Sequence, residues 1–201
     1  MKKRIALILA VVLLLGIAVG ATIAWLTDTT EEVKNTFIHS TLDVTLEETT
    51  GDEYKMIPGH YVEKDPKAGV PAGSEDAYLF VEVTEADGVV TYTDADGVSQ
   101  TTKWSDFLTY EIADGWTLVP GESNVYYRTV MADAAEADRA FYVLKDNKVY
   151  VKNTVTKEMM DALDKDTTKY PTLTFQAYAV QYWENNTTHF EPAEAWANIT
   201  G

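Results

Sequence analysis

The sequence contains no cysteine among its 201 residues, which excludes disulfide bonds, thiolate metal sites and thiol nucleophiles. Basic residues are also scarce, because 16 Lys and Arg stand against 32 Asp and Glu, for a formal net charge of −16. A protein that holds a nucleic-acid duplex needs clustered cations. The composition therefore argues against nucleic acid as a partner, and it disfavours direct binding to anionic lipid.

Histidine and nucleophile motifs are equally sparse. The three histidines, His39, His60 and His189, lie far apart in the sequence, and no H-E-x-x-H or other close pair of histidines is present. Such spacing does not predict a zinc site. The segment Gly73-Ser74-Glu75 does not match the G-x-S-x-G pattern of a hydrolase nucleophile, and we expect Ser74 to cap a turn before a strand.

One acidic loop resembles a cation-binding loop more than any other segment. Asp94-Ala95-Asp96-Gly97 has two carboxylates, but Ser105 stands where a calcium loop needs a bidentate acid. We interpret the segment as a hairpin turn. The sequence thus predicts no catalytic residue, no metal site and no cofactor, and the protein is not expected to be an enzyme.

The N-terminus has the layout of a secretory signal. Lys2, Lys3 and Arg4 precede an uncharged apolar run over residues 5–24, and Thr22-Ile23-Ala24 places small residues before a cut between Ala24 and Trp25. The acidic flank beyond this run favours an outward-facing remainder. We predict a cleaved signal peptide at residues 1–24, while an uncleaved anchor remains the alternative, since the run is long enough to span a bilayer.

Beyond the signal, β-strand patterns dominate. Residues 36–48 alternate, with Ile38, Leu42, Val44 and Leu46 on one face, and residues 77–84 are apolar on both faces, as in a central strand. Turn signals containing Gly, Asp and Pro separate these and other short candidates. The further predicted strands are 89–93, 108–112, 116–119, 125–130, 141–144, 149–152 and 172–183.

This pattern predicts an all-β fold: a single β-sandwich, jelly-roll-like, with one or two short helices and an N-terminal apolar helix in the signal. We place the β-sandwich domain at residues 36–201 and a flexible segment at 25–35. The helix candidates are 102–108, 156–163 and 192–198. The side chains expected to be buried are Val44, Leu79, Val81, Phe175, Ala177 and Ala179, and the strand aromatics are interpreted as core rather than as a sugar platform.

Several blocks together resemble a known group of exported proteins. Residues 22–44 (TIAWLTDTTEEVKNTFIHSTLDV), residues 54–83 with their PG, KDP and GSED elements, VYYR at 125–128, LTFQAYAVQ at 173–181 and a later AW carry the likeness. They resemble proteins exported through the SipW-type signal peptidase, the group of TasA and camelysin, and most closely a clostridial branch of it. Ser40 departs from the glycine that fibre-forming relatives carry before the first strand.

The resemblance implies a secreted protein at the surface of a Gram-positive bacterium, with a SipW-type peptidase as its partner during export. The leading hypothesis is a matrix protein that associates with itself or with other matrix proteins. Residues 25–40 are the candidate donor strand, anchored by Trp25, Leu26, Val33 and Phe37. The alternative is a monomeric module that binds cell-wall glycan or a protein, and the third is a metalloprotease like that suggested for camelysin, for which the sequence has no paired histidines.

Overall fold

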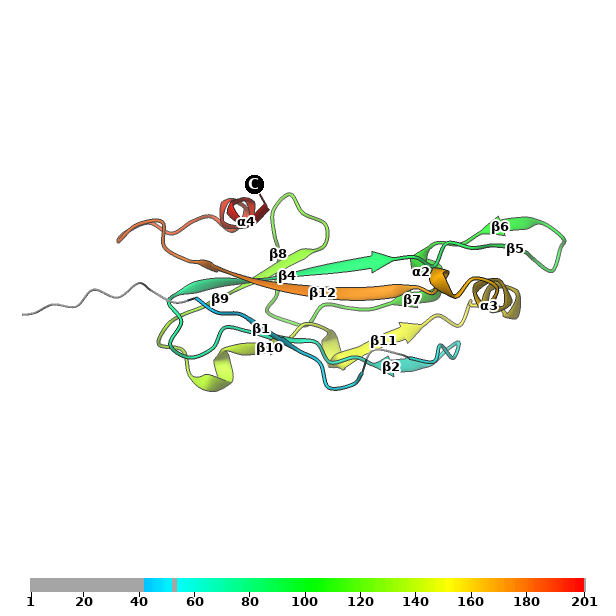
Figure 1. The fold of residues 1–201 in the computed structure, drawn as a ribbon, viewed down its shortest axis with the longest axis horizontal. Coiled ribbons are helices and arrows are strands. Elements are labelled where there is room, and N and C mark those ends of the chain that lie inside the picture. Colours follow the sequence, from blue (N-terminus) through cyan, green and yellow to red (C-terminus); the bar gives the residue numbers. More distant parts are fainter. Residues whose placement is uncertain (1–41, 52–53, 201) are drawn as a thin grey trace, which may run out of the picture. The chain divides into compact units, whose positions relative to one another are not determined.

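The computed structural model describes residues 42–51 and 54–200, all within one compact unit, Ser40–Gly201. This part of the chain is mostly β-sheet, so the predicted all-β class is confirmed (Figure 1). It contains three short α-helices rather than one or two. None of the helices within these residues has the length and apolar character needed to cross a membrane. The predicted signal peptide and the 25–35 segment lie outside the described residues.

The longest sheet has four antiparallel strands and places β4 (Ala77–Ala86) between two neighbours. Residues 77, 79, 81 and 83 of β4 are buried on one face, and Tyr78 and Phe80 are buried on the other. The prediction of a central strand here is therefore confirmed. From one edge to the other, the sheet consists of β12 (Thr172–Gln181), β4, β9 (Val125–Val130) and β8 (Thr117–Leu118).

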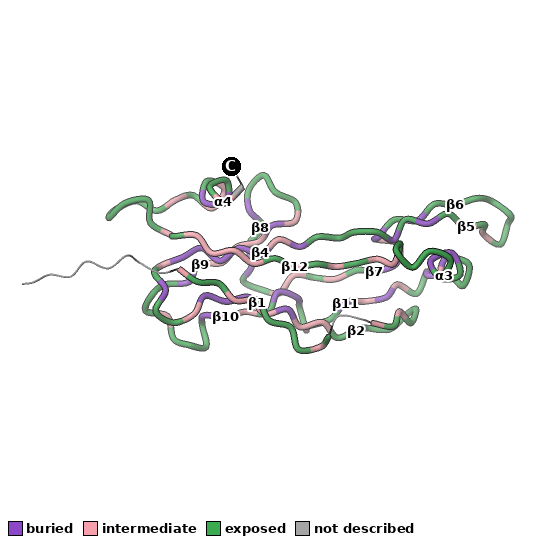
Figure 2. Tube along the Cα trace, viewed as in Figure 1, coloured by how far each residue is buried: buried purple, intermediate pink, exposed green. Residues whose placement is uncertain are grey.

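Two three-stranded sheets and a hairpin complete the strands. One sheet has the order β1 (Thr45–Glu47), β3 (Lys67–Gly69), β10 (Ala140–Tyr142), and the other has the order β2 (Tyr61–Glu63), β11 (Lys148–Val151), β7 (Leu108–Thr109). The hairpin pairs β5 (Thr91–Thr93) with β6 (Ser99–Thr101) and is largely exposed (Figure 2).

Three clusters of buried side chains hold these elements together. The first core cluster joins the β2-β11-β7 sheet to one end of β12 and includes Phe107, Val151 and Leu163. The second core cluster lies between the four-stranded sheet and the β1-β3-β10 sheet, around Leu79 and Val143. The third core cluster covers the other face of β4, where α4 (Pro192–Thr200) contributes Ala195 and Trp196.

The helices are short and follow local signals. Thr156 caps α3 (Lys157–Asp164) by accepting a hydrogen bond from the Met159 N–H at 3.4 Å, as its position before the predicted helix suggests. α2 (Trp104–Phe107) is a single turn that buries Trp104 and Phe107. The 3₁₀ turns of the described residues are η1 (Glu136–Asp138), η2 (Lys145–Asn147) and η3 (Thr167–Lys169).

The first predicted strand shows where the sequence reading was wrong. β1 covers only Thr45–Glu47, and Val44 and Leu46 are each 39% exposed rather than buried. Among the described strands, β1 pairs with β3 alone and lies at the edge of its sheet. Leu79 and Val81 are buried as predicted, whereas the three predicted core residues of β12, Phe175, Ala177 and Ala179, are only half-buried.

Candidate functional site

A groove of about 1160 Å³ opens beside the first half of β12. Its floor includes Leu108 and Val149, which belong to the first core cluster, and its β12 wall carries Leu173 and Phe175. The opposite rim comes from β1, β2 and the segment that connects them, with Leu46 among its exposed apolar side chains. The groove therefore gives an outside group access to apolar core surface.

Along this groove, one side of the β12 backbone has no strand partner among the described residues. The Val83 N–H of β4 donates to the Asn124 carbonyl at 2.9 Å, on the side of β9. Phe175 lies opposite Val83 in the antiparallel register. Because backbone groups alternate in direction along an antiparallel strand, the N–H and C=O of Phe175 point away from β4, and those of Leu173 do the same. No other strand within residues 42–51 and 54–200 pairs with this edge.

Hydrogen bonds to a single carboxylate hold the rim of the groove. Asp65 accepts from the N–H and hydroxyl of Thr49 at 2.9 and 2.5 Å, and from the N–H and hydroxyl of Thr50 at 3.0 and 2.9 Å. The bond from the Thr49 hydroxyl is the largest cause that lowers the pKa of Asp65 to about 2. This arrangement ties the segment after β1 to the segment after β2.

A second set of contacts crosses the rim at Lys64. Its ammonium lies 2.7 Å from Glu48, and it also lies over the rings of Tyr54 and Phe175, at 5.2 and 5.6 Å from the ring centroids. The Tyr54 hydroxyl donates to Glu48 at 2.8 Å. Lys64 thus links the rim to the β12 wall and leaves the rest of the groove open.

The groove can bind an extended apolar segment. A free strand edge offers backbone donors and acceptors to an added strand, and pockets beside it accept alternate side chains. Within the part of the chain that the structure describes, no cluster of three or more His, Cys, Asp or Glu residues is arranged to hold a metal ion.

The predicted cleavage and donor residues cannot be placed in this geometry. Ala24, Trp25, Leu26, Val33 and Phe37 all lie outside the described residues, and the 25–40 segment stays a prediction. Sequence reasoning did not find the groove itself. The sequence does show that the apolar Leu173 and Phe175 alternate with polar residues. This alternation predicts that one face of the strand is covered, but it does not show that one edge of the strand is open.

The acidic loop is the hairpin turn that the sequence predicts. Asp94 accepts from the N–H groups of Asp96 and Val98 at 3.1 and 2.8 Å, and from the Gln100 side-chain amide at 2.9 Å. The Gln100 bond is the main cause that lowers the pKa of Asp94. Its oxygens are engaged within the β5–β6 hairpin.

Ser74 lies at the turn before β4 and also contacts a distant segment. Its N–H donates to the Pro71 carbonyl at 3.3 Å, and its buried hydroxyl accepts a 3.4 Å hydrogen bond from the N–H of Asp43. Of the two described histidines, His60 is exposed, while His189 stacks on Tyr182 with ring centroids 4.8 Å apart. Neither belongs to a cluster of His, Cys, Asp or Glu among the described residues that could hold a metal ion.

Several of the aromatic side chains pack into the core, as predicted: Tyr78, Phe80 and Trp196 are buried, and Tyr127 and Tyr178 are half-buried against them. Trp196 packs against Phe80 and Tyr178, with ring centroids 5.4 and 5.1 Å away, in the third core cluster. Trp183, which follows β12, is 39% exposed, and Tyr61 of β2 and Tyr142 of β10 are also exposed. The rings of the third core cluster thus stabilise the four-stranded sheet.

Comparison with known proteins identifies no relative. No protein-family model matches the chain, no curated protein matches it, and no solved structure has a matching fold. The resemblance to the SipW-dependent proteins therefore rests on the sequence blocks alone.

Proposed function

We propose that this protein is an exported structural component of the cell surface or extracellular matrix that assembles by donor-strand exchange. Residues 25–40 of one copy, freed by cleavage after Ala24, add as a strand to the β12 edge of the next copy. The receiving domain is a β-sandwich of the jelly-roll type that lacks one strand. The observation that carries this proposal is the coincidence of an unpaired strand edge with a groove that reaches the core.

Length and chemistry of the donor segment support this assignment. The segment has 16 residues, more than the ten of β12, so it can pair along the edge and still connect to its own domain. Its anchors Trp25, Leu26, Val33 and Phe37 supply apolar side chains for an apolar groove. Its acidic residues suit Lys55, which lines the groove and forms no ion pair with any described residue.

The contact joins two different surfaces. The donor is the N-terminal segment, and the acceptor is the β12 edge of another copy, so each added copy exposes a fresh acceptor. Such a head-to-tail contact extends into a filament unless its rotation closes a ring. Cleavage of the signal would couple assembly to export, because the donor becomes free only outside the cytoplasm.

Deletion of residues 25–35 tests the proposal. The shortened chain should remain folded and monomeric, whereas the chain that begins at Trp25 forms filaments, as judged by size-exclusion chromatography and electron microscopy. Normal polymerisation of the shortened chain would contradict the donor role. A full-length mature chain that stays monomeric at high concentration, across pH and calcium levels, would favour the monomeric binding module.

A charge placed in the groove tests the acceptor. Leu46→Glu puts a carboxylate on the rim and should reduce filament formation, because burying an unpaired charge under a docked strand is costly. Leu118→Glu is the matched control, since Leu118 is 43% exposed, close to the 39% of Leu46, but lies in β8 at the opposite edge of the sheet. Equal effects of the two variants would contradict a specific acceptor at β12.

A further inference from the structure

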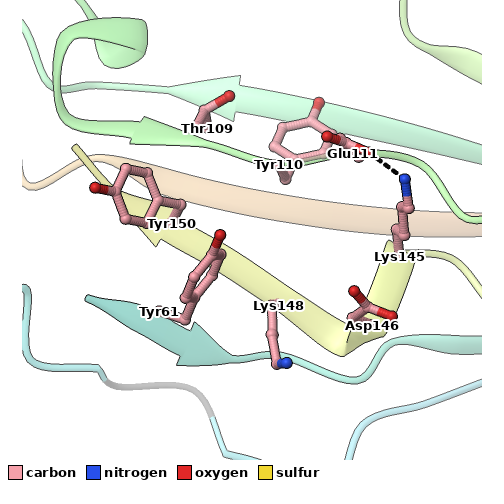
Figure 3. A pocket seen from close by; sticks show the side chains of 8 residues that line it. All are labelled: Tyr61, Thr109, Tyr110, Glu111, Lys145, Asp146, Lys148 and Tyr150. Carbon is pink, nitrogen blue, oxygen red and sulfur yellow. Dashed lines mark hydrogen bonds and ion pairs between the residues drawn. The ribbon is translucent and has the colours of Figure 1, made fainter. Parts of the chain in front are cut away.

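The outer face of the β2-β11-β7 sheet has a second hollow, of about 370 Å³ (Figure 3). Val149 and Val151 of β11 are buried in the first core cluster, so the alternation of the strand places Lys148 and Tyr150 on the opposite, outer face. Tyr150 lies opposite Tyr61 of β2 and Thr109 of β7 in the register. The hollow shares no lining residue with the groove beside β12.

Three tyrosines line this hollow, and two of them, Tyr61 and Tyr150, form a ring pair. The ring centroids of Tyr61 and Tyr150 are 5.0 Å apart and their planes are inclined by 49°. Tyr61 is 67% exposed, so most of its ring faces solvent. A tyrosine offers an apolar ring face together with a polar hydroxyl, and this combination suits a ligand with apolar C–H faces and hydroxyl edges.

Charged groups of both signs rim the rings. Lys145 pairs with Glu111 at 2.7 Å, and Lys148 lies 5.8 Å from the centroid of the Tyr61 ring. Asp146 adopts a left-handed backbone conformation, with φ of 55°, at the turn into β11, and its exposed carboxylate makes no hydrogen bond or ion pair with any residue in the described ranges. The rim therefore offers hydroxyl groups both a donor and an acceptor.

The balance of charge defines the ligand class. Two lysines and two acids line the hollow, so its formal charge is zero, in contrast to the −16 of the whole chain. An anionic polymer gains no net attraction from such a site. A protein partner needs about 800 Å² of surface on each side, far more than this hollow provides. Small-molecule sites start at about 300 Å³ and combine apolar rings with a few polar groups.

We propose that this hollow binds an uncharged polysaccharide, with a pyranose ring stacked on Tyr61 and Tyr150 and its hydroxyls bonded to Asp146 and Lys148. This site is independent of the proposed assembly, because its lining residues are separate from the groove. In a filament, every copy would present one such site, and weak binding at each would add up along the polymer.

A binding titration tests the proposal. The chain from Trp25 onward is titrated with two neutral oligosaccharides, cellohexaose and chitohexaose, and with polygalacturonate as an anionic comparison. At least one neutral oligosaccharide should bind, and Tyr61→Ala should weaken that binding roughly tenfold. Asp146→Asn should weaken it less and keep the fold, because asparagine tolerates the left-handed conformation. Tyr142→Ala is the matched control: Tyr142 is 45% exposed, and Lys67 lies over its ring at 5.4 Å, but it does not line the hollow.

The titrations and variants give different results if the hollow binds a neutral sugar and if it does not. Loss of binding in Tyr61→Ala, with Tyr142→Ala unchanged and thermal unfolding of both variants alike, supports the site. No binding of either neutral oligosaccharide, binding of polygalacturonate alone, or equal losses in the two tyrosine variants would overturn it. Filament formation is measured separately and is expected to be unchanged in all three variants, so failure here leaves the assembly proposal standing.

Discussion

At the scale of single residues, Asp65 shows how one carboxylate can organise a binding surface. Its four hydrogen bonds with Thr49 and Thr50 place the segment after β1 against the segment after β2. That segment carries Glu48 and Tyr54, which line the groove. We therefore expect the hydrogen bonds of Asp65 to determine whether the rim of the groove keeps its form.

Protonation of Asp65 at low pH should weaken the hydrogen bonds that hold this rim. The pKa of Asp65 falls from its usual 3.8 to about 2 in the folded protein, so the ionised carboxylate stabilises the fold above pH 3.8, and this stabilisation is lost as the pH drops from 3.8 through about 2. Asp65→Asn should therefore destabilise the protein in urea titrations at pH 7, with a difference from wild type that shrinks toward pH 2.

The control for this prediction is Asp133→Asn, which changes an exposed acid with no side-chain hydrogen bond to a described residue. It should have little effect at either pH. A difference between Asp65→Asn and wild type that is absent at pH 7, or that is as large at pH 2 as at pH 7, would show that Asp65 does not hold the rim.

At the scale of elements, the sequence predicts long strands well and short ones poorly. β9 has the predicted bounds, and β4 and β12 differ from theirs by two residues at one end. β2, β3 and β6, of three residues each, were missed, and the equally short β1 and β5 were predicted too long. The error at Val44 and Leu46 has a physical cause: alternation identifies two faces of a strand but not whether a neighbouring element covers either one.

A pair of phenylalanines in neighbouring strands distinguishes the central strand from the edge strand. Phe80 of β4 is fully buried, so Phe80→Ala should cost about 3–5 kcal/mol. Phe175 of β12 is half-buried beside the groove, so Phe175→Ala should cost about 1–3 kcal/mol in the monomer. Urea titration of the two variants measures both values, and a larger loss for Phe175 than for Phe80 would contradict the assigned edge.

At the scale of the whole molecule, the groove is a product of tertiary structure. Leu46, Val62, Met160 and Phe175 come from four separate elements that meet only in the folded chain. The direction of the free backbone groups depends on the pairing of β12 with β4, which no local pattern determines. The export signal and the donor segment are, by contrast, contiguous in the sequence, and the sequence alone predicts them.

Amide hydrogen exchange, measured residue by residue, tests whether residues 25–40 add to the β12 edge. The chain that begins at residue 36 would be compared with and without a peptide of residues 25–40. If the peptide adds to the β12 edge, exchange should slow at Leu173 and Phe175, whose N–H groups face the groove, while Thr174 is slow in both samples and Leu118 of β8 does not change. Unchanged exchange at Leu173 and Phe175, or slowing confined to β8, would contradict the account.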